Sequence, residues 1–228
     1  MEKVRFGTGI AEAAQATGTT IVIDTFRAFT TAAVLFEAGV ETVYLSETLD
    51  QARALARAVG GLLCGEDDGR RPPDFDLSNS PHEAAMRTDL GGATIVQRTS
   101  AGTRSVVAAL RAGAHPVYAA SLVVASATAA VASRDPEITI ISSGLHGSEP
   151  AVEDDLTAAL IADRIMGSIP DPQIGQRIRS CDRAMTLASA PWANPGDVDI
   201  ASATDKYSFA MEAFRDGAGR VQLRRLAG

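Results

Sequence analysis

The stretch VIDTFRAFTT, residues 22–31, joins two different sequence patterns. The apolar run that ends at Ile23 is typical of a buried strand, and the apolar residues after Thr31 recur at helical spacing. A carboxylate, Asp24, and a guanidinium, Arg27, stand between the two patterns. A strand that passes directly into a helix predicts an α/β fold, and polar groups at that junction predict a ligand site there.

The same alternation continues along the chain. Apolar runs predict strands at Thr20–Asp24, Thr42–Leu45, Leu62–Cys64, Thr94–Gln97, Val117–Ala119 and Ile138–Ile141. Helical spacing predicts helices over residues 48–59, over residues 102–113 and after Pro150. Strands that are apolar throughout and alternate with helices favour a largely parallel sheet flanked by helices. Residues 209–226 differ, because two strand-like runs surround a glycine-rich turn and predict a C-terminal antiparallel hairpin.

We predict one α/β domain over residues 1–228. The sequence leaves open a smaller C-terminal lobe that begins at about residue 168. Residues 67–81 read as a loop with three prolines. A connection of that length in a compact domain is often functional, so we expect it to contribute to a site.

Composition excludes several classes of protein. The net charge of −7 and the 5% of aromatic residues are unsuited to nucleic-acid binding. Two cysteines are too few for a disulfide framework, and no apolar run is long enough for a membrane span. We therefore expect a cytoplasmic protein that binds neither nucleic acid nor membrane. A homodimer is expected only because two-fold oligomers are the commonest kind.

Polar residues follow five of the predicted strands. In chain order they include Asp24 with Arg27, Glu66, the run Arg98–Thr103, Ser121, and Ser142 with Ser143. Carboxyl ends of parallel strands meet at one edge of a sheet, where helix N-termini and arginines favour anions. Each group also has a local explanation, since Ser and Thr cap helices and acids such as Glu153–Asp155 oppose a helix dipole. The coincidence of five strand ends favours an anion site.

Common catalytic motifs are absent from the sequence. It has no phosphate-binding P-loop, no dinucleotide fingerprint and no nucleophile elbow. Asp24 resembles the nucleophile of haloacid-dehalogenase-type phosphatases, but Phe26 stands where those enzymes have a second aspartate. A metal-assisted reaction remains, with Mg²⁺ held by carboxylates among Asp24, Glu66 and Glu153–Asp155.

Six motifs together resemble the 2-phosphosulfolactate phosphatase family, whose members are Mg²⁺-dependent hydrolases of a phosphate ester. They are VIDTFRAFTT (22–31), Gly65-Glu66, FDLSNSP (75–81), RTSAGT (98–103), AVEDD (151–155) and the tail ATDKYSFAMEAFRD (203–216). The resemblance spans nearly the whole chain, and FDLSNSP is its most specific element. It implies a small anionic phosphorylated substrate, hydrolysis of 2-phospho-3-sulfolactate to sulfolactate and phosphate, and a place in coenzyme M biosynthesis.

The resemblance also implies roles for individual residues. Catalytic roles fall to Asp24, Arg27, Glu66 and Asp154, and metal binding to Asp24, Glu66, Glu153 and Asp154. Substrate binding falls to Thr30, Thr31, Asn79, Ser80, Arg98, Thr99, Ser100, Gly102 and Thr103. Arg27 would clamp one anionic group and Arg98 a second. Attack by a Mg²⁺-activated water is preferred, and a covalent aspartyl-phosphate on Asp24 stays open.

Two departures from the family pattern affect the substrate. Ser100-Ala101 stand where the family commonly has threonine–asparagine, and Leu122–Val124 fill positions where an asparagine is expected after Ser121. Two amide side chains are thus missing. The alternatives are a phosphatase for another small phosphorylated acid and a non-catalytic anion-binding protein on the same fold.

Overall fold

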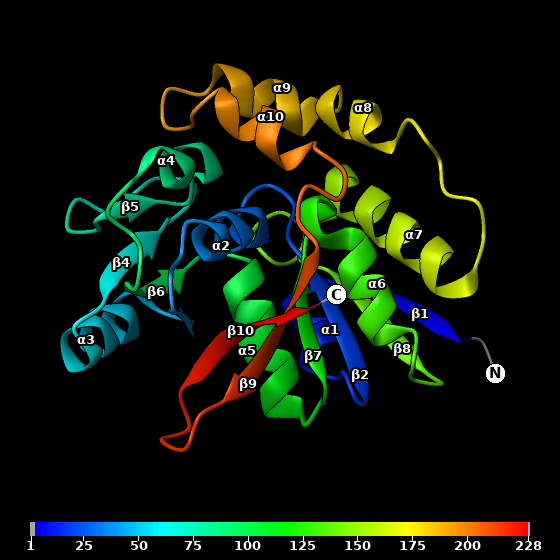
Figure 1. The fold of residues 1–228 in the computed structure, drawn as a ribbon, viewed down its shortest axis with the longest axis horizontal. Helices are drawn as coiled ribbons and strands as arrows, with labels where there is room; N and C mark the ends of the chain where they lie inside the picture. Colours follow the sequence, from blue (N-terminus) through cyan, green and yellow to red (C-terminus); the bar gives the residue numbers. More distant parts are fainter. Residues whose placement is uncertain (1–2, 228) are drawn as a thin grey trace.

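The computed structural model describes residues 3–227, in which strands and helices alternate along most of the chain (Figure 1). The strands are β1 (Val4–Thr8), β2 (Thr19–Ile23), β3 (Thr42–Ser46), β4 (Leu62–Gly65), β5 (Leu77–Ser78), β6 (Thr94–Arg98), β7 (Val117–Ala120), β8 (Ile138–Ser142), β9 (Phe209–Arg215) and β10 (Val221–Ala227). The helices are α1 (Gly9–Ala13), α2 (Ala28–Glu37), α3 (Leu49–Val59), α4 (Pro81–Met86), α5 (Gly102–Ala112), the 3-10 helix η1 (Leu122–Val124), α6 (Ala125–Ala132), α7 (Val152–Met166), α8 (Ile174–Arg179), α9 (Asp182–Ser189) and α10 (Gly196–Ala201). The predicted α/β class is confirmed.

The ten strands of the described residues form one sheet, in the order β1-β8-β2-β7-β9-β10-β3-β6-β4-β5. The first four strands of this order are mutually parallel, and so are the last four. The hairpin β9–β10 lies between them, with β9 antiparallel to β7 and β10 antiparallel to β3. The predicted hairpin is confirmed, and it joins two parallel halves in the middle of the sheet.

Two strands were not predicted from the sequence. β1 lies at one edge of the sheet and exposes Arg5 and Phe6, so it lacks the continuous apolar run of the inner strands. β5 lies at the other edge, has two residues, and falls inside the segment 67–81 that was predicted as a loop. Edge strands are buried on fewer sides, and their sequence signal is correspondingly weak.

The sheet curls strongly. Four strands lie between β2 and β6, so the two would be roughly 24 Å apart in a flat sheet. A hydrogen bond of 3.0 Å nevertheless joins the N–H of Gly102, just after β6, to Asp24, just after β2. The carboxyl ends of the two parallel halves therefore face each other across the curl.

Helix α2 fills the inside of this curl. Its residues from Ala28 to Phe36 are all buried, in keeping with a helix that is apolar on every side. Val22 of β2 packs in the same core, whereas its neighbours Ile21 and Ile23 pack in a second core with helices α6 and α7. Both faces of β2 are thus covered, as the uninterrupted apolar strand predicted.

Helices α8, α9 and α10 form a cap that runs across one end of the sheet, over the ends of α2 and α4 (Figure 1). After α10 the chain leaves the cap and enters the central hairpin. Residues beyond 168 therefore contribute both to the cap and to the middle of the sheet. A small apolar cluster of Ala184, Leu187 and Val198 forms the interior of the cap.

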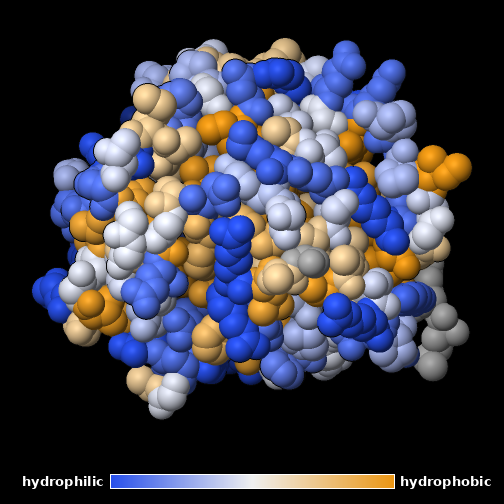
Figure 2. Space-filling view, in the orientation of Figure 1, coloured by the Kyte–Doolittle hydropathy of each residue, from blue (hydrophilic) through white to orange (hydrophobic). Residues whose placement is uncertain are grey.

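The surface is mixed in character. On the face shown in Figure 2, hydrophilic residues surround small separate groups of hydrophobic ones. Among the helices of residues 3–227, none has the length and apolar character needed to cross a membrane.

Substitution of Gly65, the last residue of β4, tests how tightly the strand ends are packed. Its φ is +142°, and a Cβ there would lie 1.9 Å from the carbonyl oxygen of Arg98. We expect Gly65→Ala to lower the free energy of unfolding by about 2–4 kcal/mol or to prevent folding, because neighbouring backbone would have to move. Urea unfolding measures this. Gly91→Ala, where nothing lies near the added carbon, is the control; equal stability of the two variants would contradict the packing.

Candidate active site

A cavity lies at the carboxyl ends of the strands, between the curled sheet and the cap. It contains about 460 Å³ of space, part of it open to solvent. Its lining residues come from the segments after β2, β4, β5, β6 and β8 and from α9 of the cap: Asp24, Phe26, Arg27, Glu66, Gly69, Asn79, Ser100, Ala101, Gly144, Leu145, His146 and Arg183. This is the position at which open α/β sheets bind ligands.

Asp24 links the two halves of the curl. One carboxylate oxygen accepts the N–H of Ala28 at 2.9 Å, and the other accepts the N–H of Gly102 at 3.0 Å. A Cβ at position 102 would lie 2.6 Å from the second oxygen, so glycine allows the α5 backbone to approach. The predicted Asp24 and Gly102 are therefore in direct contact.

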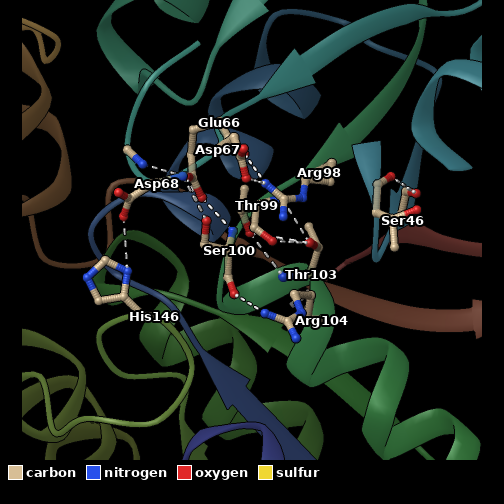
Figure 3. Close-up of polar contacts among 12 residues, drawn as sticks. Ser46, Glu66, Asp67, Asp68, Arg98, Thr99, Ser100, Thr103, Arg104 and His146 are labelled. Atoms are coloured by element: carbon tan, nitrogen blue, oxygen red, sulfur yellow. Dashed lines mark hydrogen bonds and ion pairs between the residues drawn. The ribbon is translucent and has the colours of Figure 1, made fainter. Parts of the chain in front are cut away.

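Glu66 lies on the cavity wall beside Ser100 (Figure 3). Its Oε1 accepts the Ser100 N–H at 2.5 Å, and its Oε2 accepts the Ser100 hydroxyl at 2.9 Å. Oε2 also accepts the N–H of Gly69 at 2.6 Å. The carboxylate therefore connects the loop after β4 to the turn after β6.

Asp154 and Glu153 open helix α7 and do not belong to the cavity lining. Asp154 accepts the N–H of Thr25 at 2.8 Å and that of Gly144 at 3.1 Å, so it supports the turns after β2 and β8 from behind. Glu153 is also buried, and its Oε2 has no hydrogen-bond partner within residues 3–227.

Burial raises the pKa values of three of these carboxyl groups. It raises the pKa of Asp24 to about 6, with the charge of Glu66 adding to the effect and two backbone N–H groups opposing it. It raises the pKa of Glu153 to about 7, and that of Asp154 well above its ordinary value, with Asp24 contributing repulsion to both. The site thus concentrates more negative charge than the buried surroundings stabilise.

The chemistry of the donor set fits a hard divalent cation. Oxygen ligands predominate, the carboxylates repel one another, and Asp24 and Glu66 line the cavity. Within residues 3–227, however, no group of three or more His, Cys, Asp or Glu side chains could hold a metal ion on its own. The predicted four-carboxylate set is therefore not one preformed cluster. Mg²⁺ commonly binds one or two carboxylates and keeps several waters, which Asp24 and Glu66 can accommodate.

Arg27 lines the cavity but is already paired. Its Nη1 donates to Asp197 of α10 at 3.0 Å, and its Nη2 donates to the carbonyl of Gly69 at 3.2 Å. Both members of the ion pair are nearly inaccessible to solvent, at 4% and 0% exposure. The guanidinium also lies 5.3 Å from the ring of Trp192. Arg27 therefore fastens the cap to the turn after β2.

The predicted Asn79 and Ser80 lie side by side in sequence but differ in their contacts. Asn79 lines the cavity, and its buried Oδ1 has no hydrogen-bond partner among the described residues. Ser80 donates its hydroxyl to Asp197 at 2.5 Å and caps α4 through the N–H of Glu83. The segment FDLSNSP thus contributes one side chain to the cavity and one to the support of Arg27.

Four predicted threonines do not line the cavity. Thr30 and Thr31 lie within the buried helix α2, where Thr30 donates to the carbonyl of Thr25. Thr99 and Thr103 exchange hydrogen bonds, since each backbone N–H is accepted by the other's hydroxyl. The hydroxyls of Thr30, Thr99 and Thr103 serve local structure, which is the alternative explanation that the sequence allowed, whereas the buried Thr31 hydroxyl has no hydrogen-bond partner among the described residues.

Arg98 also lies outside the cavity lining. Its Nη1 donates at 2.7 Å both to the carbonyl oxygen of Glu66 and to the carboxylate of Asp67. Figure 3 shows the Arg98 side chain extending toward Asp67. Arg98 lines a separate cleft with Arg53 and Arg104. Its contact with substrate stays a prediction from the family resemblance.

Four side chains that contribute charge, hydrogen bonds or cation–π contacts at the site were not among the predicted residues. Arg183 and His146 line the cavity, and Trp192 and Asp197 hold Arg27. His146 follows β8, so its position at a strand end was a usable signal. The other three come from the cap, far along the chain, and no motif connects them to Asp24.

Comparison with known proteins identifies one family of relatives. A family model described as 2-phosphosulpholactate phosphatase matches residues 8–210. A probable 2-phosphosulfolactate phosphatase of Thermus thermophilus is 36% identical over 162 residues, which are 69% of this chain and 66% of the relative. A probable 2-phosphosulfolactate phosphatase of Deinococcus radiodurans is 33% identical over 202 residues, which are 80% of this chain and 82% of the relative. One of Thermotoga petrophila is 30% identical over 165 residues, 72% and 68% of the two chains.

The family match covers most of the chain and defines its class: a family of phosphatases, that is, of phosphoric monoester hydrolases. Within that class, the chain belongs to the 2-phosphosulfolactate phosphatase family. The resemblance carried by the six sequence motifs is confirmed.

The buried ion pair predicts the stability of the cap. Asp197→Ala leaves the buried Arg27 guanidinium without its carboxylate, and we expect a loss of about 3–5 kcal/mol in the free energy of unfolding. Asp199→Ala, on the same helix but with an exposed ion pair to Arg179, should change stability by less than about 0.5 kcal/mol. Urea unfolding distinguishes the two, and similar losses in both variants would contradict a special role for Asp197.

Glu153 predicts a pH dependence in metal-free protein. The pKa of Glu153 is raised to about 7, so the folded protein keeps this proton at pH values where the unfolded chain has already released it. The stability that the bound proton provides is therefore lost as the pH rises through about 7. Relative to wild type, Glu153→Gln should therefore gain roughly 1–2 kcal/mol between about pH 5 and pH 8. Thermal unfolding in EDTA measures this. The exposed Glu149→Gln should show no such trend, and a pH-independent Glu153→Gln difference would contradict the prediction.

Proposed function

We propose that the chain is a Mg²⁺-dependent phosphatase that hydrolyses 2-phospho-3-sulfolactate to sulfolactate and phosphate. The observation that carries the proposal is the cavity itself, which is lined by two carboxylates, Asp24 and Glu66, and by two arginines, Arg27 and Arg183. A site that only bound anions would gain nothing from acids beside its ligand, whereas a phosphatase uses them to bind a cation and to orient water.

Asp24 and Glu66 would hold the cation, because they are the carboxylates of the cavity wall. When bound there, Mg²⁺ would shield the phosphate charge and lower the pKa of a coordinated water. Glu153 and Asp154 lie behind this wall and add to the negative potential that favours a cation.

The chain's own residues would position the ester. The substrate carries several negative charges, and arginines in a cavity shielded from solvent bind such groups more strongly than arginines in water. Asn79 offers a buried amide with a free acceptor oxygen, suited to a hydroxyl or a bound water. Rate acceleration would come mainly from positioning and charge neutralisation as water attacks phosphorus and the alcohol oxygen leaves. A covalent intermediate on Asp24 stays an alternative.

A second substrate assignment is favoured by one lining residue. Ala101 lies on the cavity wall at a position where the family pattern commonly has an asparagine. Leu122, Val123 and Val124, at the other departure, are fully buried in η1 and do not line the cavity. Only the first departure therefore alters the wall, and the alternative is a phosphatase for another small phosphorylated carboxylic acid. The cytoplasmic location, the homodimer and the role in coenzyme M biosynthesis stay predictions.

The substrate assignment is tested by phosphate release from a panel that includes racemic 2-phosphosulfolactate and phospholactate, with Mg²⁺ or with EDTA. We expect release from phosphosulfolactate with Mg²⁺ and at least about a 100-fold lower rate in EDTA. Preference for another phosphorylated acid would support the second assignment, and unchanged rates in EDTA would contradict the metal requirement.

Asp24 is tested by substitution. Asp24→Asn should lower kcat by at least about 1,000-fold, since it removes a charge at the reacting centre, while the protein stays folded by circular dichroism. Asp155→Asn is the matched control, because Asp155 is exposed beside Asp154. An active Asp24→Asn enzyme would remove the central role of this carboxylate.

A further inference from the structure

We propose that Arg183, in the first turn of cap helix α9, is the residue that binds the phosphoryl group of the substrate. The inference rests on the proposed function and adds to it a binding residue that the motifs of the sequence do not indicate. The arginines around the cavity differ in whether a carboxylate of the protein already pairs with them.

Arg27 and Arg98 have carboxylate partners. Arg27 is ion-paired with the buried Asp197, and Arg98 is paired with Asp67. Any anion that approached either guanidinium would have to share it with a carboxylate already in place. The positive charges of Arg27 and Arg98 are therefore largely neutralised by carboxylates of the protein itself.

Arg183 has no such carboxylate partner among the described residues. It lines the cavity, which Arg98 does not, and within residues 3–227 it forms no ion pair with a carboxylate. Its buried Nε, like that of Arg98, has no hydrogen-bond partner there. Leaving a buried donor of a charged group unpaired is unfavourable unless a ligand or water accepts from it. A planar guanidinium with free donors suits the oxygens of a phosphoryl group.

The position of Arg183 agrees with a phosphoryl contact. Arg183 lines the same cavity as Asp24 and Glu66, the carboxylates of the proposed reacting centre. A phosphoryl group bound beside Arg183 would have its negative charge opposed by the guanidinium.

Trp192 packs beside Arg183 and provides a fluorescence probe of this site. Its ring lies 6.0 Å from the Arg183 guanidinium and 5.3 Å from that of Arg27, so it packs beside both. Trp192 also packs against the apolar cluster inside the cap. It is the single tryptophan of the chain, so intrinsic tryptophan fluorescence reports on this site alone.

The test is direct binding of inorganic phosphate, in the presence and absence of Mg²⁺, followed by Trp192 fluorescence and by isothermal titration calorimetry. We expect Arg183→Met to weaken phosphate binding at least about 10-fold, and Arg183→Lys, which keeps the charge without the planar fork, by several-fold. Binding of sulfolactate, which lacks the phosphoryl group, should change by less than about twofold. Arg179→Met is the control, because Arg179 is exposed on α8 and paired with Asp199.

The outcomes separate this inference from the proposed function. Selective loss of phosphate binding in Arg183→Met supports it, even if the wild-type protein hydrolyses no ester of the panel. Equal phosphate affinity in wild type and Arg183→Met, no phosphate binding by wild type, or an equal loss in Arg179→Met would overturn it. Calorimetry guards against a fluorescence change that reflects only the altered surroundings of Trp192.

Discussion

Backbone N–H groups that hold buried carboxylates are the interaction on which this site depends. Asp24, Glu66 and Asp154 each accept N–H groups from two different positions, and each carboxylate has at least one such bond to a segment that follows a different strand. Such bonds stabilise a charge without cancelling it, in contrast to an ion pair. These carboxylates are therefore not neutralised by a paired cation, and burial, with added repulsion from neighbouring acids, raises the pKa values of Asp24 and Asp154.

This arrangement requires the sheet to curl. Asp24 and Gly102 belong to the two parallel halves, which are separated in the strand order by the hairpin β9–β10 and the strands beside it. The hairpin is antiparallel to both neighbours, so it can join two parallel units without a crossover helix. The segment at the end of the chain thus determines how segments near its beginning meet.

The cap depends on the turn after β2. Phe26 packs on the apolar cluster of the cap, and Arg27 binds Asp197 on α10. Phe26 therefore has a structural use at the position where haloacid-dehalogenase-type enzymes place a second aspartate. A turn that holds the cap with two adjacent residues also determines where the cap presents Arg183 to the cavity.

The sequence by itself determined the α/β class, the inner strands and the residues that share a strand end, because apolar periodicity and strand-to-helix junctions are local signals. Asp24, Glu66, Ser100 and Gly102 were found in this way, and Asn79 came from the family resemblance. Only the tertiary structure decided that Arg27 pairs with Asp197, that Thr30 faces the core, and that Arg183 completes the cavity. These facts depend on contacts between segments far apart in the chain, and no local pattern specifies which side chain neutralises another across a fold.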